Sequence, residues 1–144
     1  MKKAEKEVLE RIDALQPWMV EQARELISIP TVNPYSGDPD APGEAAGQAW
    51  MEQRLKELGA RLRRIPVPAD IYARFGLIGP PGRHWKGRDN VVAEWDFGKG
   101  GPTILLNTHM DTVGTAGMTI SPFDPVVRGG YLYGRGSSDS KGNL

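Results

Sequence analysis

Apolar residues recur at helical spacing through the first part of the chain. The first run holds Val8, Leu9, Ile12 and Leu15, and the second holds Val20, Ala23, Leu26 and Ile27. Pro17 lies between the runs, where it fits the first turn of a new helix, so the pattern predicts an N-terminal helix that is kinked or broken there. After a turn-rich loop to Gly43, a second helix is expected from about Glu44 to Leu58, with Gly59 as its left-handed C-cap.

Beyond the second helix the hydrophobic period changes from 3.6 to 2, which is the period of β-strands. Strands are predicted at 62–67, near a sheet edge because of its prolines, and at 91–97, with one buried face. The run 104–106 is Ile-Leu-Leu without polar alternation, so 103–108 is predicted as a strand buried on both faces. Most of 70–88 is expected to be loop.

The C-terminal part of the chain predicts a hairpin followed by a glycine-rich loop. Val126-Val127 and Tyr131–Tyr133 flank a Gly-Gly pair that suits a tight turn. The loop 134–141 comes next, and Asp139 or Ser140 is the candidate N-cap of a helix that begins there. Helices followed by these strands indicate a layered α/β fold.

Composition narrows the range of functions. The 144 residues are enough for one domain with a real core. Eighteen basic and eighteen acidic residues give zero net charge, so the charge makes no case for a nucleic acid or an anionic membrane as partner. Cysteine is absent, which excludes thiolate metal sites and leaves His and carboxylates as metal ligands. Because no signal-peptide pattern or long apolar stretch occurs, we expect a cytoplasmic protein.

His109 and Asp111 follow the most apolar predicted strand, where open α/β sheets usually present active-site residues. Two positions apart in extended chain, both side chains leave the same face. The Asp111 carboxylate can then accept a hydrogen bond from one imidazole nitrogen and leave the other nitrogen for a divalent cation. A structural histidine or a strand cap would give the same short pattern and is the alternative.

Asp139 lies in the sequence Gly-Arg-Gly-Ser-Ser-Asp-Ser-Lys-Gly, whose glycines allow close backbone approach. A carboxylate in such a loop can bridge two cations about 3.5–4 Å apart, as in two-metal hydrolases. The alternative is that Asp139 only caps the helix that begins there.

Taken together, these motifs resemble the signature of metallopeptidase family M20, which includes acetylornithine deacetylase, succinyl-diaminopimelate desuccinylase, aminoacylase and glutamate carboxypeptidases. The similarity covers almost the whole chain. It is carried by segments 29–34, 55–59, 109–113, 121–123, 129–136 and 139–142. Where relatives usually have a Trp and an Asp before Pro-Phe, this chain has Met118 and Ser121.

The resemblance implies a zinc-dependent amide hydrolase, a deacylase or exopeptidase that acts on N-acyl amino acids or small peptides. It implies that His109 binds one Zn²⁺, that Asp111 serves catalysis by orienting His109, and that Asp139 bridges two Zn²⁺ ions and precedes a cis peptide bond. Co²⁺ would be a substitute metal. The implied fold is the N-terminal part of a zinc-exopeptidase-like α/β/α sandwich with a mixed central sheet.

Two zinc ions that share one carboxylate need about five protein ligands, and this chain supplies two. His84 lies in a basic, glycine-flanked stretch and is not expected to be a third. We therefore expect 1–144 to be the N-terminal portion of the catalytic domain. Its C-terminal part and a lid or dimerisation domain, through which the protein could oligomerise, would be absent. Alone, the chain should be inactive.

Other functions fit the sequence less well. A nucleotide-binding P-loop requires Gly directly before Lys141, where Ser140 stands, and no G-x-S-x-G elbow surrounds Ser137 or Ser138. The remaining alternative is a noncatalytic binding or regulatory module that keeps the family fold. The joint presence of a ligand, its orienting carboxylate and a bridging carboxylate weakly disfavours that alternative.

Overall fold

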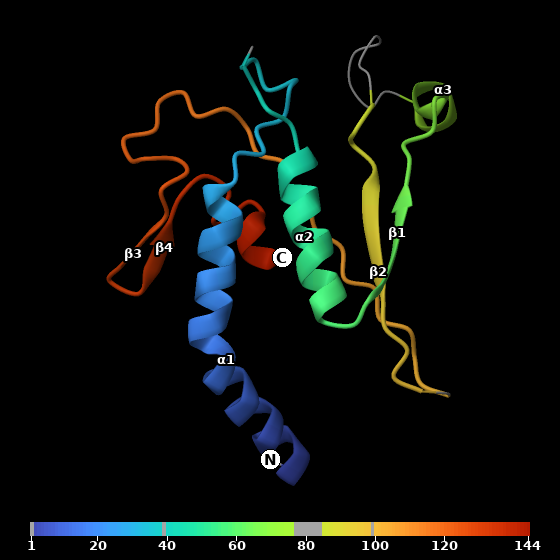
Figure 1. The fold of residues 1–144 in the computed structure, drawn as a ribbon, viewed down its shortest axis with the longest axis vertical. Helices are drawn as coiled ribbons and strands as arrows, with labels where there is room; N and C mark the ends of the chain where they lie inside the picture. The colour runs from blue at the N-terminus through green and yellow to red at the C-terminus, as the bar shows by residue number, and fades with distance from the viewer. Residues whose placement is uncertain (1, 39, 77–84, 99) are drawn as a thin grey trace.

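The computed structural model describes residues 2–38, 40–76, 85–98 and 100–144. Its elements are α1 (Lys3–Ser28), α2 (Ala45–Glu57), β1 (Arg61–Ile65), α3 (Ile71–Phe75), β2 (Asn90–Glu94), β3 (Val126–Arg128), β4 (Tyr131–Tyr133) and the 3-10 turn η1 (Lys141–Asn143). Helix α2 packs on α1 and contacts both β1 and β2 (Figure 1). The fold is therefore mixed α/β, as the sequence predicted.

A kink or a break was predicted at Pro17; helix α1 is continuous through Pro17, so a break is wrong. A proline inside a helix removes one backbone hydrogen bond, and here the flanking turns remain helical. The first turns project beyond the other elements (Figure 1). Apolar residues expected to pack are consequently exposed there: Val8, Leu9 and Ile12. The buried part of α1 is its C-terminal end, where Leu26 and Ile27 are almost inaccessible.

A small core forms around that end of α1, and its apolar members are Leu26, Ile27, Val32 and Met51. Helix α2 begins one residue after and ends one residue before the predicted limits of Glu44 and Leu58, and Gly59 has a φ of 80°, as expected of a left-handed C-cap. Gly47 of α2 permits close packing, because a Cβ there would lie 2.7 Å from the methyl group of Thr31.

An isolated parallel bridge joins Val32 to Thr112, the residue that follows Asp111. The backbone N–H of Thr112 donates to the carbonyl of Thr31 (3.0 Å), and the N–H of Asn33 donates to the carbonyl of Thr112 (2.7 Å). The Thr31 hydroxyl donates to the carbonyl of Met110 (2.6 Å). These bonds place the loop after α1 directly beside residues 109–113.

The described strands form two antiparallel pairs, β1 with β2 and β3 with β4. In the first pair Arg61 lies opposite Glu94, and their side chains form an ion pair. The second pair is the predicted hairpin, with Val126 opposite Tyr133. Helix α3 was not predicted and lies within the stretch expected to be loop.

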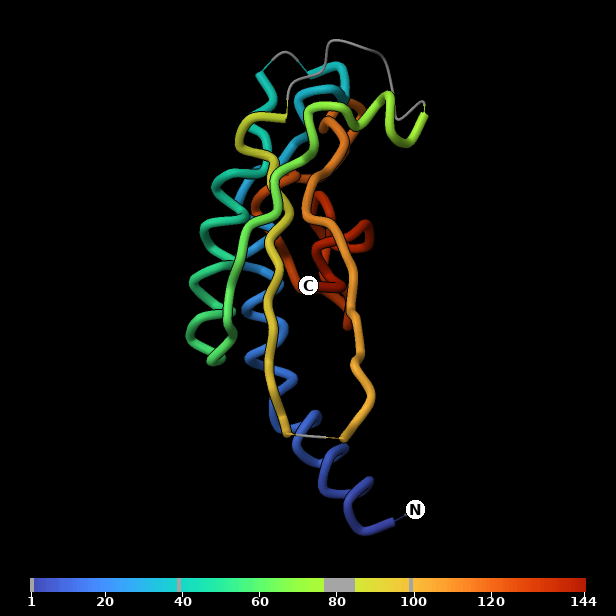
Figure 2. The backbone as a smooth tube through the Cα atoms, turned by 90° about the vertical axis from the view of Figure 1, so that its right-hand side faces the viewer, coloured from blue at the N-terminus to red at the C-terminus, as the bar shows by residue number. Residues whose placement is uncertain are grey.

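The segment 103–108 corrects the prediction of a doubly buried strand. It belongs to neither sheet, and Ile104, Leu105 and Leu106 are 79%, 85% and 89% exposed. Figure 2 shows it as an extended trace that runs back apart from β2. Among the described residues no strand pairs with this segment, so its apolar side chains have nothing to pack against.

In the described part of the chain, no helix combines the length and the apolar character needed to cross a membrane.

Candidate metal centre

Residues 109–113 and the loop 134–141 meet at the end of the Val32–Thr112 bridge. The backbone N–H of Arg135 donates to the carbonyl of Pro122 (2.7 Å), and the N–H of Lys141 donates to the carbonyl of Gly136 (2.8 Å). Gly136 has a φ of 88°, and a Cβ on it would lie 2.9 Å from the methyl group of Thr112. Only glycine therefore lets this loop adopt its turn and approach Thr112 so closely.

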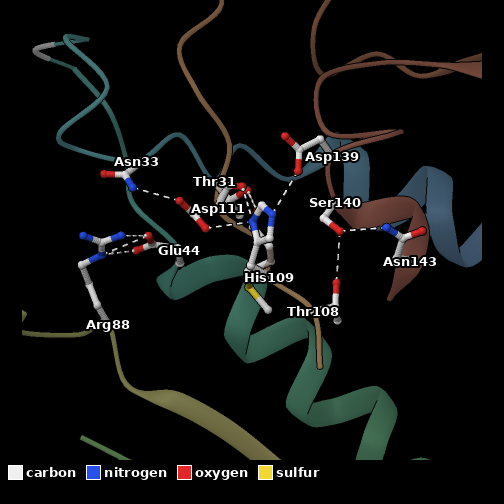
Figure 3. Close-up of polar contacts among 11 residues, drawn as sticks. Thr31, Asn33, Glu44, Arg88, Thr108, His109, Asp111, Asp139, Ser140 and Asn143 are labelled. Atoms are coloured by element: carbon white, nitrogen blue, oxygen red, sulfur yellow. Dashed lines mark hydrogen bonds and ion pairs between the residues drawn. The ribbon is translucent and has the colours of Figure 1, made fainter. Parts of the chain in front are cut away.

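His109 lies between two carboxylates (Figure 3). Its Nδ1 is 3.0 Å from Oδ1 of Asp111, and its Nε2 is 3.0 Å from Oδ1 of Asp139. The first contact is the one predicted from the two-residue spacing. The second brings together residues thirty positions apart in the sequence. The structure thus places all three predicted site residues in one cluster, while their roles as ligands stay a prediction.

Asn33 is a further member of this cluster that the sequence did not single out. Its side-chain amide donates to Oδ2 of Asp111 (2.9 Å), on the carboxylate whose other oxygen faces His109 (Figure 3). Its own side-chain oxygen accepts from the backbone N–H of Tyr35 (2.9 Å), which fixes the orientation of the amide. The only sequence signal for Asn33 was its place in the 29–34 segment of the family resemblance.

The two carboxylates favour a protonated imidazole. Burial lowers the pKa of His109, but the charge of Asp111 and the hydrogen bond with Asp139 outweigh it and hold that pKa above its ordinary value. In this arrangement Nδ1 donates to Asp111 and Nε2 donates to Asp139. A divalent cation that takes the place of the Nε2 proton would keep the same two partners, since metal binding to histidine releases a proton.

Lys141 fixes the loop of Asp139 against α1. The side chain of Lys141 is almost fully buried, and its ammonium group donates to the carbonyls of Leu26 (3.1 Å) and Ile29 (2.6 Å). Burial lowers the pKa of Lys141 to about 8. A cation at the C-terminal end of a helix also meets the negative end of the helix dipole. Lys141 is the second residue of this region that sequence reasoning missed as a site component.

The peptide bond between Asp139 and Ser140 is cis, as the family resemblance implied. The Ser140 hydroxyl lies 3.2 Å from that of Thr108 and accepts a hydrogen bond from the side-chain amide of Asn143 (2.9 Å). The expected helix beyond Ser140 is present as the single 3-10 turn η1. No side-chain cap joins Asp139 to it, so the carboxylate of Asp139 is left facing His109.

A pocket of about 390 Å³ opens beside the cluster. Three chain segments supply its lining: Asn33, Tyr35 and Ser36; His109, Asp111, Thr112 and Val113; and 134–139. The side chains of His109 and Asp139 are 52% and 88% exposed, so a solute can reach both.

The donor set fits a divalent metal ion. A neutral imidazole nitrogen held by a carboxylate on its far side, together with a carboxylate oxygen, is a combination that zinc and similar metals prefer. Within the described ranges, no group of three or more His, Asp or Glu side chains is arranged to hold a metal. His84 lies outside the described residues. His109 and Asp139 are therefore two candidate ligands, and a complete metal centre would need more.

Comparisons with known proteins find a family and relatives that this chain resembles. The model of Peptidase family M20/M25/M40 matches residues 105–144, which contain His109, Asp111 and Asp139. The chain is 31% identical over 124 residues to an uncharacterized metallohydrolase of Methanococcus maripaludis, an alignment that covers 84% of this chain and 28% of that protein. No solved structure matches the chain.

Several relatives carry the name succinyl-diaminopimelate desuccinylase. The one from Stenotrophomonas maltophilia is 32% identical over 123 residues, which cover 83% of this chain and 25% of that protein. The one from Xanthomonas euvesicatoria pv. vesicatoria is 44% identical over 106 residues, which cover 72% of this chain and 23% of that protein. The chain thus spans about a quarter of the length of these relatives.

Proposed function

This chain belongs to peptidase family M20/M25/M40, and on that premise we propose that it forms part of a zinc-dependent amide hydrolase. The observation that carries the proposal is the approach of His109 Nε2 to Asp139 Oδ1, 3.0 Å apart, within the segment that the family model matches. Two relatives named desuccinylases and one named a metallohydrolase make metal-dependent hydrolysis the coarse class. The choice of zinc as the metal and the roles of His109, Asp111 and Asp139 belong to the proposal.

In this proposal His109 would hold one Zn²⁺ through Nε2, and the Asp139 carboxylate would be shared between that ion and a second. Asp111 would accept a hydrogen bond from the Nδ1–H group, which holds the imidazole in the tautomer whose Nε2 lone pair is free. Asn33 in turn holds the Asp111 carboxylate in the orientation that faces His109. Zinc, when bound, would polarise a substrate carbonyl and lower the pKa of a bound water to about 7.

The remaining ligands and the proton-accepting group are proposed to lie outside these 144 residues. Two shared zinc ions require about five protein ligands, and the described residues bring two together. The larger size of the relatives leaves ample chain for the others. We propose that 1–144 is the N-terminal portion of an α/β/α sandwich domain, in which 103–108 becomes an inner strand.

The proposed substrates are N-acyl amino acids or small peptides. Some relatives are named succinyl-diaminopimelate desuccinylase, and the substrate in that name is an N-acyl amino acid. A pocket of about 390 Å³ beside His109 has room for part of such a molecule. The chain alone should hydrolyse none of them, because its metal centre lacks ligands.

Metal binding to the chain itself tests the proposal. The chain is titrated with Co²⁺, followed by its visible absorption, and with Zn²⁺, followed by calorimetry. His109→Ala and Asp139→Ala should each weaken binding at least about tenfold, because each removes one of two ligands. His84→Ala is the matched control, since it removes the only other histidine and should leave binding unchanged.

The outcomes separate the hypotheses. Loss of binding in both site variants with an unaffected His84→Ala supports the proposed centre. Equal binding in all variants would contradict it and favour a noncatalytic module. Zinc-dependent hydrolysis of an N-acyl amino acid by the 144-residue chain would contradict the proposal that its metal centre is incomplete.

A further inference from the structure

Arg135 lines the pocket beside His109 but has no part in the cluster of carboxylates around the imidazole. Among the described residues its side chain makes no hydrogen bond or ion pair, and its Nε is buried without a partner. A guanidinium carries five N–H donors in a fixed fork and keeps its charge at any ordinary pH. Within the described residues these donors therefore have no acceptor.

The other partly buried arginines of the described chain are used differently. Arg54 pairs with Glu25, and Arg88 pairs with Glu44. Arg135 forms no such pair, although Asp111 and Asp139 line the same pocket. Both of those carboxylates face His109 instead. The positive charge of Arg135 is thus left uncompensated at the wall of a pocket.

Two hydroxyl groups of residues that line the same pocket also lack partners. Oγ of Ser36 and Oγ1 of Thr112 are buried and make no hydrogen bond within the described residues. Buried polar atoms without partners are uncommon in folded proteins, and each one calls for an explanation such as a water or a ligand. Hydroxyl groups and guanidinium groups both donate readily to carboxylates. A carboxylate is therefore a suitable acceptor for Ser36, Thr112 and Arg135 alike.

We propose that Arg135, with Ser36 and Thr112, forms a subsite that binds a free carboxylate of the substrate. The proposal rests on the proposed function for the nature of that substrate, an acyl amide whose scissile bond lies at His109 and Asp139. A guanidinium binds a carboxylate through two parallel hydrogen bonds, which gives orientation as well as attraction. The subsite would therefore select substrates with a negative charge at a fixed place beside the amide.

The carboxylate has two sources, the acyl group or the amino acid, and two small probes separate them. N-methylsuccinamic acid carries its carboxylate on the acyl side of an amide, and N-acetylglycine carries it on the amine side. N-acetylglycinamide is the neutral control. Each is titrated into the metal-free chain in the presence of a chelator, and binding is followed by NMR shifts of the backbone amides of residues 36, 112 and 135.

Arg135→Gln removes the charge and the fork, and we expect it to weaken binding of at least one acidic probe about tenfold or more. Arg135→Lys keeps the charge without the fork and should weaken the same probe several-fold. Arg11→Gln is the matched control, because Arg11 is exposed on α1 and should not change binding. Circular dichroism melts of all variants confirm that each is folded.

The probe that depends on Arg135 identifies the side of the amide that the subsite reads. The inference is overturned if both acidic probes bind the wild type and Arg135→Gln equally, or if neither binds more tightly than the neutral control. Because no metal is present, failure of the zinc titrations would leave this result untouched. Conversely, if zinc binds normally and the affinity for the probes does not depend on Arg135, the proposed subsite is contradicted and the proposed metal centre is still supported.

Discussion

The side-chain amide of Asn33 donates to Oδ2 of Asp111 at 2.9 Å, across 78 positions of sequence. Asp111 uses its other carboxylate oxygen to contact Nδ1 of His109. Asn33 therefore reaches the imidazole through Asp111, without touching the nitrogen that faces Asp139. The contact links the loop after α1 to the candidate metal centre.

Asn33→Asp should weaken divalent metal binding, since a second negative charge beside Asp111 would turn or protonate that carboxylate. Outer partners of metal ligands typically change affinity about 10–100-fold, and a residue one step further out should change it up to about tenfold. Co²⁺ titration measures the effect. Asn107→Asp, on the exposed segment before His109, is the control and should leave affinity unchanged. An Asn33→Asp protein that binds Co²⁺ normally would contradict this role.

Lys141→Met should destabilise the chain by about 1–3 kcal/mol, because the carbonyls of Leu26 and Ile29 would lose their buried donor. Methionine nearly keeps the volume of the side chain, so the effect reports the hydrogen bonds and the charge. Urea unfolding measures it, and Lys86→Met, at an exposed position, is the control. A change below about 0.5 kcal/mol would show that Lys141 does not hold the loop of Asp139 to α1.

The sequence predicted the local features of the site and missed the distant ones. The contact between His109 and Asp111 follows from a two-residue spacing in extended chain, which needs no knowledge of the fold. Asn33 and Lys141 contact groups 78 and more than 110 positions away, and such contacts depend on how the elements pack. No periodicity or motif spacing encodes that packing.

The same limit explains the errors in the fold. An apolar run such as 104–106 indicates a preference for burial, but it does not identify the element that covers it. Likewise, Pro17 predicted a kink or a break because proline disfavours helix interiors, and the break did not occur because one missing hydrogen bond is tolerated in a helix of 26 residues. The second helix and the hairpin were right because their caps and turns are local signals, such as Gly59.

Arg54→Gln should raise the pKa of Glu25 toward 4.5. The Arg54 guanidinium donates to Glu25 at 2.7 Å between α2 and α1, and this hydrogen bond holds the pKa of that carboxyl below its ordinary value. A lowered folded pKa gives stability that is present above the unfolded pKa and is lost as the pH falls through the folded one. The wild type should therefore lose stability below about pH 4.5, and the variant less so.

Carboxyl NMR titration of Glu25 checks the direction of this shift, and unfolding in urea at neutral and acidic pH checks the stability. Arg11→Gln removes an equal charge from an exposed position of α1 and should leave the titration of Glu25 unchanged. The contribution should be small, because the side chains of both partners are about one third exposed. An unaltered Glu25 titration in Arg54→Gln would show that the pair does not persist in solution.

Leu105→Ser should leave the free energy of unfolding within about 0.5 kcal/mol of the wild type, because the Leu105 side chain is 85% exposed and buries almost nothing. Leu26→Ser is the matched control. Leu26 is 2% exposed at the buried end of α1, and removal of such a side chain typically costs about 2–5 kcal/mol. Urea unfolding at low protein concentration compares the two. If Leu105→Ser were as destabilising as Leu26→Ser, another surface must cover 103–108 in solution, and sedimentation would show whether that surface is a second copy.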